Sequence, residues 1–428
     1  MLNRNVTECA SKMRRFLSEE VLNALGKQTE FSQRMRKLTP ARAVWTFVTG
    51  LASGTANTIA DFVRLFEDLT GDTIAYKPFH DRLSNATFPE LIRATLSSLM
   101  SQLTLPILQG KSRYLKRFED ILVQDGSSFA LNDALSETYP GRFTKVSPAA
   151  VEVHCTYSLY KGQATRFGVA PDKDPERTYL PEAASLRAKL ILFDRGYTCY
   201  EYGSAVKAAG GDFIGRVKDK NFNPTIRKCF RGFCNKKALE GKRLKDLVLP
   251  KSNVDFLIEG SDTHGKVHQL RLVLFYVARK GIHVYLLTSL SPGEFAPSIV
   301  ASLYRLRWQV ELFFKECKSY TKLQKFMTKD PCIVEGLIWA SLLAVLIRRF
   351  LLHSAFRHSA KRAAPFIAAA MSWTFFLSLA KTAVHGLAHL AETIRPILER
   401  LQRTAERTNT HRASTFDLLD IHPIAAYG

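Results

Sequence analysis

The chain has 428 residues, more than one hydrophobic core usually serves, so we expect two or three structural units of roughly 100 to 200 residues each. Its 61 Lys and Arg residues exceed its 39 Asp and Glu residues by 22. This excess favours nucleic acid as partner over the alternatives of a membrane-surface protein or a merely soluble cationic surface. Seven cysteines, scattered from Cys9 to Cys332, speak against a secreted disulfide framework and favour a reducing cytoplasm.

The first 115 residues predict a helical region. Residues 59–69 carry a short apolar repeat, Gly71 ends it, and residues 76–85 begin a second short helix. Helix, turn and helix with Arg and Lys residues is the outline of a helix-turn-helix DNA reader, although helical hairpins also occur in proteins that bind no DNA. We predict that residues 1–115 form a DNA-binding region.

From Phe118 the sequence favours β-structure. Short runs of branched and aromatic residues bounded by turn residues predict strands. These runs cover residues 120–131, 149–159, 163–171, 188–197 and 212–219. A helix that ends at Gly210 separates the last two runs. Two apolar segments, ILVQD and LILFD, resemble buried central strands and end in Asp125 and Asp194, which would place both carboxylates at strand ends.

Residues 220–282 predict a β-rich insertion. The segment begins basic and turn-rich and continues in two alternating strands, residues 254–260 and 268–280. A further strand is expected at residues 283–290. The insertion therefore separates two parts of a mixed α/β unit.

The C-terminal region, residues 326–428, reads as helical. Its two most apolar stretches are residues 336–347 and 363–380. The first is too short for a membrane span, and the second reaches the minimum length only by including a proline and several hydroxyl residues. We interpret both as buried helices and expect no membrane partner.

Residues 304–318, YRLRWQVELFFKECK, predict one amphipathic helix with two separate stripes. The apolar stripe, which can face a core, consists of Leu306, Val310, Phe313 and Cys317. The polar stripe consists of Tyr304, Arg307, Glu311 and Lys318. An i,i+4 salt bridge of about 0.3 to 0.5 kcal/mol would explain only Arg307 and Glu311. The phenol and the amine favour a ridge that binds phosphate beside a metal-bound group.

Three carboxylates stand out by context, those of Asp125, Asp194 and Glu311. Hard divalent cations prefer carboxylate oxygens, and a two-metal site needs carboxylates from separate elements that converge in the fold. For each aspartate alone, a turn or cap at a strand end is the simpler interpretation. All three together, in a basic protein, favour a metal site.

The spacing Tyr304-x2-Arg307-x3-Glu311-x6-Lys318 matches the Y-(2)-R-(3)-E-(6)-K signature of the bacterial insertion-sequence type 4 family of cut-and-paste transposases. The segments ILVQDGS and LILFDRGY resemble the strands that carry the two catalytic aspartates of that family. The resemblance implies an α/β fold with a ribonuclease H-like catalytic core. This core would cover residues 116–325, interrupted by the β-rich insertion at 220–282 and flanked by the helical regions 1–115 and 326–428.

The resemblance also implies a function. Asp125, Asp194 and Glu311 would be the catalytic residues and would hold two Mg2+ or Mn2+ ions. The enzyme would nick each element end, form a hairpin on that end, open it and join the end to target DNA. The implied phosphate contacts are Tyr304, Arg307 and Lys318, together with Arg216 just after the DFIG strand.

The implied partner is double-stranded DNA, both the terminal inverted repeats of the element and the target. Because a synapse joins two ends, we expect at least a dimer on DNA, acting in the bacterial cytoplasm at the nucleoid. Two other functions stay open: a transposase-derived DNA-binding protein that no longer cuts, and a structure-specific nuclease that cuts but joins nothing.

The sequence departs from some relatives, which stack a flipped base on a tryptophan of the insertion. No tryptophan lies in residues 220–282. An aromatic face is all that stacking requires, so four other side chains could serve. They are Phe222, Phe230, Phe233 and Tyr276.

Several other patterns receive structural interpretations. The zinc-like set Cys229, Cys234, His264 and His268 has too long a central gap for a zinc finger. Adjacent His154 and Cys155 would point to opposite faces of a strand and cannot share a proton. Trp308 could stack a base, but on an amphipathic helix a core position is the more common one. Glu316 lies off the polar stripe, so Glu311 is the predicted catalytic glutamate.

Overall fold

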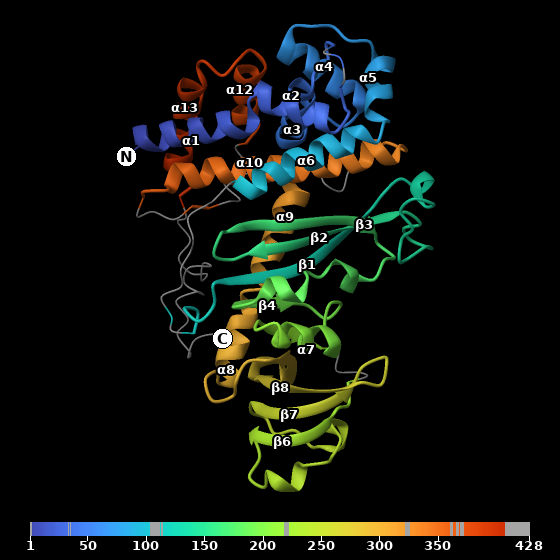
Figure 1. Cartoon of the computed structure of the whole chain (residues 1–428), viewed down its shortest axis with the longest axis vertical. Helices are drawn as coiled ribbons and strands as arrows, with labels where there is room; N and C mark the ends of the chain where they lie inside the picture. Colours follow the sequence, from blue (N-terminus) through green and yellow to red (C-terminus); the bar gives the residue numbers. More distant parts are fainter. Residues whose placement is uncertain are drawn as a thin grey trace.

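A body of helices lies at one end of the molecule and a nine-stranded sheet extends away from it (Figure 1). The architecture comes from a computed structural model. The structure describes residues 2–32, 34, 36–102, 112, 114–217, 222–321, 326–359, 363, 364, 368 and 372–406.

The first five strands form the ribonuclease H-like core. They are β1 (Asp120–Ala130), β2 (Ala150–Ser158), β3 (Gln163–Pro171), β4 (Lys189–Phe193) and β5 (Asp212–Arg216). Their order is β3-β2-β1-β4-β5, with β1, β2 and β3 antiparallel in sequence and with β4 and β5 added parallel to β1. This order and these directions are the ribonuclease H-like arrangement, so the predicted fold class is confirmed.

The β-rich segment after β5 extends the same sheet. Its strands are β6 (Thr225–Arg231), β7 (Val254–Ser261), β8 (Val267–Val277) and β9 (Ile282–Thr288). All pair antiparallel in the order β5-β9-β8-β7-β6, which makes β6 the outer edge. The prediction of turns at the start of this segment was wrong at β6. The register of β6 shifts twice, so its buried residues Ile226 and Cys229 do not follow the two-residue period that reveals a strand.

Helices from both ends of the chain form one body. The N-terminal ones are α1 (Leu2–Leu17), α2 (Glu19–Gln28), α3 (Pro40–Ser53), α4 (Ile59–Thr70), α5 (Tyr76–Leu83) and α6 (Thr87–Gln102). The C-terminal ones are α10 (Pro331–Phe356), α12 (Ser372–Val384) and α13 (Leu390–Thr404). Helix α10 packs on α6 and α3, α12 on α3, and α13 on α1 (Figure 1). The two terminal regions thus share a hydrophobic core.

Local signals explain where these helices begin and end. Thr58 and Asp61 form a reciprocal capping box at the start of α4, and Gly71 ends α4 in the left-handed conformation that favours glycine. Asp330 accepts a hydrogen bond from the amide of Ile333 at the start of α10. The predicted helix–turn–helix outline is therefore present as α4 and α5.

Helix α10 is the one described helix long and apolar enough to cross a membrane, but 83% of its most apolar window is buried inside the protein. Core helices of globular proteins meet the same criteria of length and composition. The prediction of a buried helix at residues 336–347 is confirmed. Of the second apolar stretch, residues 363–380, only the part in α12 and three single positions lie within the described residues.

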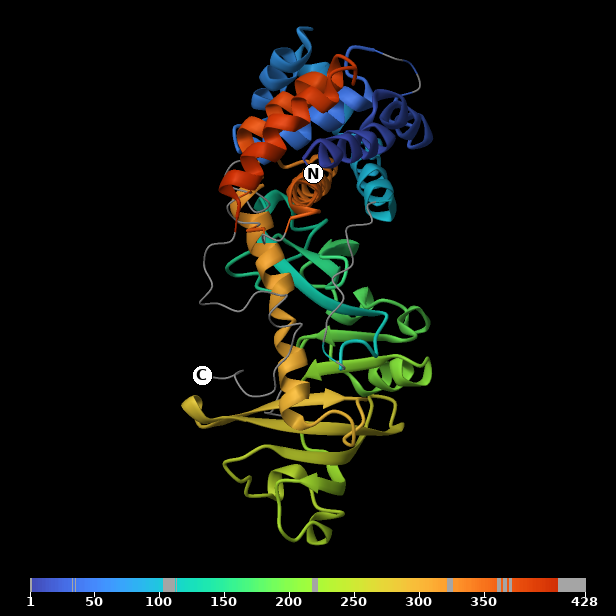
Figure 2. The ribbon, with the colours of Figure 1, turned by 90° about the vertical axis from the view of Figure 1, so that its left-hand side faces the viewer.

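Helices cover both faces of the sheet. Helix α7 (Tyr200–Ala208) lies on one face, where Gly203 contacts Phe213. On the opposite face, α8 (Pro297–Arg305) packs on β8 and β5, and α9 (Trp308–Tyr320) packs on β1 (Figure 2). Successive residues of β4 alternate between the two resulting cores. The chain leaves this second face through α9 and enters the helical body at α10.

The prediction of one continuous helix over residues 304–318 was wrong. Helix α8 ends at Arg305 and α9 begins at Trp308. Between them the amides of Leu306 and Arg307 donate to the carbonyls three residues earlier, at 3.0 Å each. Hydrogen bonds that reach back three residues, instead of the four of an α-helix, tighten the turn and allow the helix axis to change direction. The predicted apolar stripe is nevertheless buried throughout.

Candidate active site

Asp125 and Asp194 are neighbours across two parallel strands. The pairing of β1 with β4 ends at Gln124 and Phe193, so the two aspartates are the next residues on adjacent strands. Asp194 follows its strand directly, as predicted. Asp125 does not end its strand, because β1 continues to Ala130 through its antiparallel pairing with β2. One carboxylate therefore stands within a strand and the other on a turn beside it.

The helical pair α8 and α9 brings the third carboxylate to this place. The Arg307 guanidinium donates to Asp125 Oδ2 at 2.9 Å and also to Glu311. The Tyr304 hydroxyl donates to Asp194 Oδ1 at 3.2 Å. Segments far apart in the sequence, β1, the turn after β4, and α9, thus meet around one guanidinium.

The two remaining predicted residues lie at the edges of this group. Lys318 Nζ donates to the carbonyl oxygen of Ser128 on β1 at 3.0 Å, three residues beyond Asp125. Arg216 closes β5, where its carbonyl accepts from the Thr198 hydroxyl at 2.6 Å. The charge of Arg216 is close enough to lower the pKa of the Tyr304 phenol, although burial raises that pKa more strongly. Arg216 thus lies near Tyr304, and Lys318 is bound to the strand that carries Asp125.

The carboxylates influence one another. Burial raises the pKa of Asp125 from 3.8 to about 7. Arg307 works against this shift, whereas Asp194 and Glu311 add to it through like-charge repulsion. Such mutual repulsion is expected where several carboxylates share a small volume, and it produces a strong attraction for cations.

We expect the contribution of Asp125 to the stability of metal-free protein to fall as the pH rises. The raised pKa means that folded Asp125 binds its proton more tightly than the unfolded chain does. Its contribution is therefore fully present below about pH 4 and is lost as the pH rises through about 7. The thermal midpoint of the wild type minus that of Asp125→Asn, measured in EDTA, should fall across this range. Asp125→Asn should flatten part of the slope, whereas Glu137→Gln, at an exposed carboxylate, should keep it. An unchanged slope for Asp125→Asn would contradict this assignment.

Comparison with known proteins identifies the family. The model of the family described as "Transposase DDE domain" matches residues 116–347, more than half of the chain. The chain belongs to this family. It is a DNA transposase, and the family implies nuclease and transesterase chemistry.

Relatives of this transposase come from bacterial insertion sequences. The transposase for insertion sequence element IS231F of Bacillus thuringiensis subsp. israelensis is 23% identical over 375 residues, which cover 78% of each chain. The putative transposase InsL for insertion sequence element IS186A of Escherichia coli is 46% identical over 65 residues, 15% of this chain and 18% of the relative. Among solved structures, a piggyBac transposase synaptic complex with hairpin DNA aligns with a TM-score of 0.46 and 13% identity, covering 92% of this chain and 85% of that one.

Transposases of this family generally use divalent metal ions. The donor chemistry of this transposase fits such an ion, because Asp125, Asp194 and Glu311 offer carboxylate oxygens and already surround one positive charge. In the described part of the chain, no three His, Cys, Asp or Glu side chains are already gathered as a ligand set. The guanidinium of Arg307 stands between two of the carboxylates, those of Asp125 and Glu311.

Trp308 corrects the expectation of a core position. Its side chain is 56% exposed, beside Arg307 at the start of α9. Trp308 does not belong to the apolar stripe, because it lies two residues from both Leu306 and Val310 and therefore on the opposite side of the helix. The aromatic side chains of the insertion serve other contacts: Phe222 stacks on Tyr200, and Phe233 on Phe256. The sequence interpretation named Trp308 as a residue that could stack a base but favoured a core position, and its exposure shows that the core position was wrong.

Other structural interpretations agree with the contacts. His268 uses both ring nitrogens, one toward Ser204 and one toward Asp262, each at 2.8 Å. His154 is a strand residue of β2. Glu316 points away from the active site and pairs with Arg348 and Arg349 on α10. These residues hold elements together and do not reach the three carboxylates.

Proposed function

We propose that this transposase moves an insertion sequence by a cut-and-paste reaction at Asp125, Asp194 and Glu311. One observation carries the proposal: Arg307 joins Asp125 to Glu311, while Tyr304 of the same signature reaches Asp194. Carboxylates from three separate segments of a ribonuclease H-like core are thereby bound by two neighbouring side chains of the signature. The family match supports the same chemistry.

We propose that these carboxylates hold two Mg2+ or Mn2+ ions, which when bound activate the attacking oxygen and stabilise the leaving oxygen. Tyr304 would fix the rotamer of Asp194 by donating to its Oδ1. Arg307 would turn from Asp125 and Glu311 toward a phosphate oxygen, for which its planar donor pair is suited. Residues 116–325 would thus form the catalytic unit, interrupted at 220–282.

Arg307 and Lys318 should each contribute to DNA binding, with Tyr304 and Arg216 beside them. Every neutralised phosphate releases condensed counterions, so each alanine substitution should lower the slope of log affinity against log salt by about 1. Affinity for a duplex carrying the flanking inverted repeat, measured by fluorescence anisotropy at several salt concentrations, checks this. Lys145→Ala, at an exposed position of another loop, is the control. An unchanged slope for Arg307→Ala would leave Arg307 as a salt-bridge partner alone.

We propose that residues 1–115 read the element end through α4 and α5. Helix α5 exposes Tyr76 and Lys77 at its start, and Tyr76 stacks on His80. This arrangement resembles the polar surface that a second helix presents to a DNA groove. The helical region 326–428 would support it, because α12 packs on α3 and α13 packs on α1.

We propose that the reaction passes through a hairpin at the element end, with Trp308 stacking an unpaired base. Its exposed ring next to Arg307 supports this role, since stacking contributes about 1 to 3 kcal/mol per base. Trp308→Ala should reduce hairpin formation about tenfold or more while sparing the first nick. Denaturing gels of a labelled end separate the two products. Equal loss of both would show that Trp308 acts before the hairpin step.

The experiment that tests the proposed function uses a plasmid whose two inverted repeats come from the flanks of the gene. Incubation with the protein, Mg2+ and target plasmid should release the element and join its 3′ ends to the target. Cutting without joining would favour a structure-specific nuclease, and binding without cutting would favour a derivative that no longer cuts.

Sedimentation of the DNA complex should reveal at least two protein copies per pair of ends. Its site of action would be the nucleoid in the cytoplasm, where the DNA is.

A further inference from the structure

A partly buried cluster of polar side chains lies on the face of β1 opposite the three carboxylates. Asp125 points toward α9, so its neighbours Gln124 and Gly126 face the other side of the sheet. There a set of side chains from four segments forms what we call the rear layer. It consists of Arg142, Glu152, His154, Glu176 and Tyr197.

The rear layer touches both segments that carry the aspartates. A methyl group added to Gly126, the residue after Asp125, would overlap the Glu152 carboxylate and crowd the Tyr197 hydroxyl. A methyl group added to Gly196, two residues after Asp194, would overlap the Glu176 carboxylate. Both glycines thus allow a close approach that any other residue would prevent.

The members of the layer are joined to one another. Arg142 donates to Glu152 Oε2 at 3.2 Å and to Glu176 Oε1 at 3.1 Å, and so links the groups that cover the two glycines. The Tyr197 hydroxyl lies 2.8 Å from His154 Nδ1. Tyr197 belongs to the turn of Asp194, because its amide donates to the Asp194 carbonyl at 3.2 Å. The tyrosine therefore ties this turn to β2, which pairs with β1.

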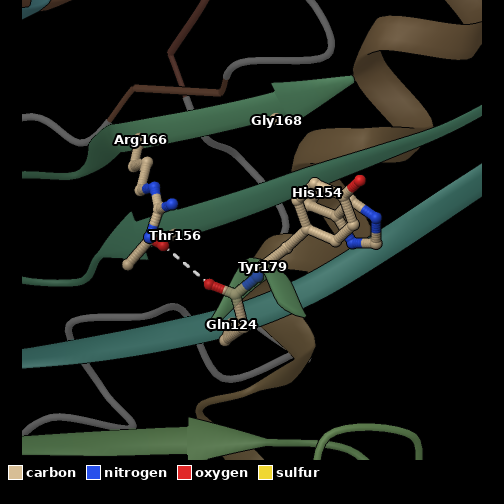
Figure 3. Close-up of a pocket in the computed structure, with 6 residues that line it drawn as sticks. All are labelled: Gln124, His154, Thr156, Arg166, Gly168 and Tyr179. Carbon is tan, nitrogen blue, oxygen red and sulfur yellow. Dashed lines mark hydrogen bonds between the residues drawn. The ribbon is translucent and has the colours of Figure 1, made fainter. Parts of the chain in front are cut away.

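His154 itself has little freedom to move. Its side chain is 2% exposed and stacks on Tyr179, with ring centroids 4.0 Å apart and planes 7° apart (Figure 3). His154 also lines a small polar pocket with Gln124 and Thr156, which are hydrogen-bonded at 2.6 Å, and its other nitrogen, Nε2, lies 4.0 Å from Glu152 Oε2. A ring held in this way gives Tyr197 a fixed anchor.

We propose that the rear layer, through Tyr197, His154 and Arg142, sets the spacing between Asp125 and Asp194 and so determines the affinity for the divalent metal. These are positioning residues that touch neither the metal nor DNA. The proposal rests on the proposed function, since it assigns a consequence to the spacing of those aspartates. Outer groups that orient metal ligands typically change metal affinity or activity by about 10- to 100-fold when removed.

The test is Mn2+ binding to the full-length protein, followed by electron paramagnetic resonance of the free ion. Tyr197→Phe removes one hydroxyl and should weaken binding about tenfold. Tyr179→Phe is the matched control, because it removes a hydroxyl that donates to Asp174 and keeps the stacked ring. Its affinity should equal that of the wild type. Arg142→Lys should also weaken Mn2+ binding. Because the Arg142 side chain is 41% exposed, this variant tests the rear layer even where Tyr197→Phe does not fold.

The outcomes separate the two proposals. If wild-type protein binds Mn2+ no better than Asp125→Asn, the proposed metal site is wrong. If the wild type binds Mn2+ through Asp125 but folded Tyr197→Phe and Arg142→Lys both bind with wild-type affinity, the rear layer has only a structural role and this inference is overturned. A double substitution of Tyr197→Phe and His154→Gln should weaken binding no more than the stronger single one, because both remove the same hydrogen bond.

Discussion

Asp125→Asn, Asp194→Asn and Glu311→Gln should each lower metal-dependent cleavage of an element end at least about 10³-fold. Each substitution removes one charged ligand from the place where Arg307 and Tyr304 hold the three carboxylates together. Several kcal/mol of transition-state stabilisation depend on the bound metal, and about 4 kcal/mol corresponds to 10³ in rate. Single-turnover cleavage of a labelled duplex in Mg2+ measures the loss.

These substitutions should leave folding and end binding intact. Each side chain is replaced by an amide of similar size at a partly accessible site, and Glu311 is 32% exposed. Glu137→Gln, at an exposed loop position, is the control and should cleave at the wild-type rate. Cleavage by any one of the three variants within tenfold of the wild type would show that its carboxylate is not a required ligand.

Glu316→Ala should lower the free energy of unfolding by about 3 to 5 kcal/mol, although it lies on the same helix as Glu311. The Glu316 side chain is 1% exposed and pairs with Arg348 at 3.2 Å and Arg349 at 2.8 Å. Removing one partner from a buried ion pair leaves an uncompensated charge, and here two guanidinium groups lose the same carboxylate. The substitution should therefore loosen α9 from α10.

Urea denaturation followed by circular dichroism compares the two glutamates directly. Glu311→Gln should change the unfolding free energy by no more than about 0.5 kcal/mol while removing cleavage. Glu316→Ala should do the opposite: it should lower the unfolding free energy strongly, while the protein that stays folded should still cleave. Equal stability losses would mean that Glu311 also acts as a structural residue. A small loss for Glu316→Ala would mean that water compensates both arginines.

Parts of the site could be read from the sequence because they depend on local patterns. Apolar runs that end in aspartate indicated the neighbouring strands β1 and β4, and the signature spacing selected Glu311 over Glu316. The strand that extends beyond Asp125 was not evident, since it depends on the antiparallel partner β2. Local sequence sets the type of an element, and its partner sets where the element ends.

The break between α8 and α9 had no local signal. Residues 304–308 include neither glycine nor proline. The break has a tertiary cause: α8 packs on β5 and β8, whereas α9 packs on β1, and the two lie at different positions of a twisted sheet. Trp308 follows Leu306 by two residues and so lies on the side of the helix opposite the apolar stripe, which agrees with its exposed side chain.

The rear layer was only partly visible in the sequence. Strand β2 alternates Glu152, His154 and Thr156 with apolar residues, a pattern that places the three polar side chains on one face. Arg142 comes from a loop and Glu176 from a short 3₁₀ turn, so no spacing rule joins them to β2. Their convergence depends on the folded chain, as does the close approach to Gly126 and Gly196.

Anomalous diffraction from crystals of the transposase bound to a pre-cleaved element end in Mn2+ would test the metal site most directly. We expect two anomalous peaks, in direct contact with carboxylate oxygens of Asp125, Asp194 and Glu311, and Arg307 turned onto a phosphate. Peaks located elsewhere, with Arg307 still between Asp125 and Glu311, would contradict the proposed active site.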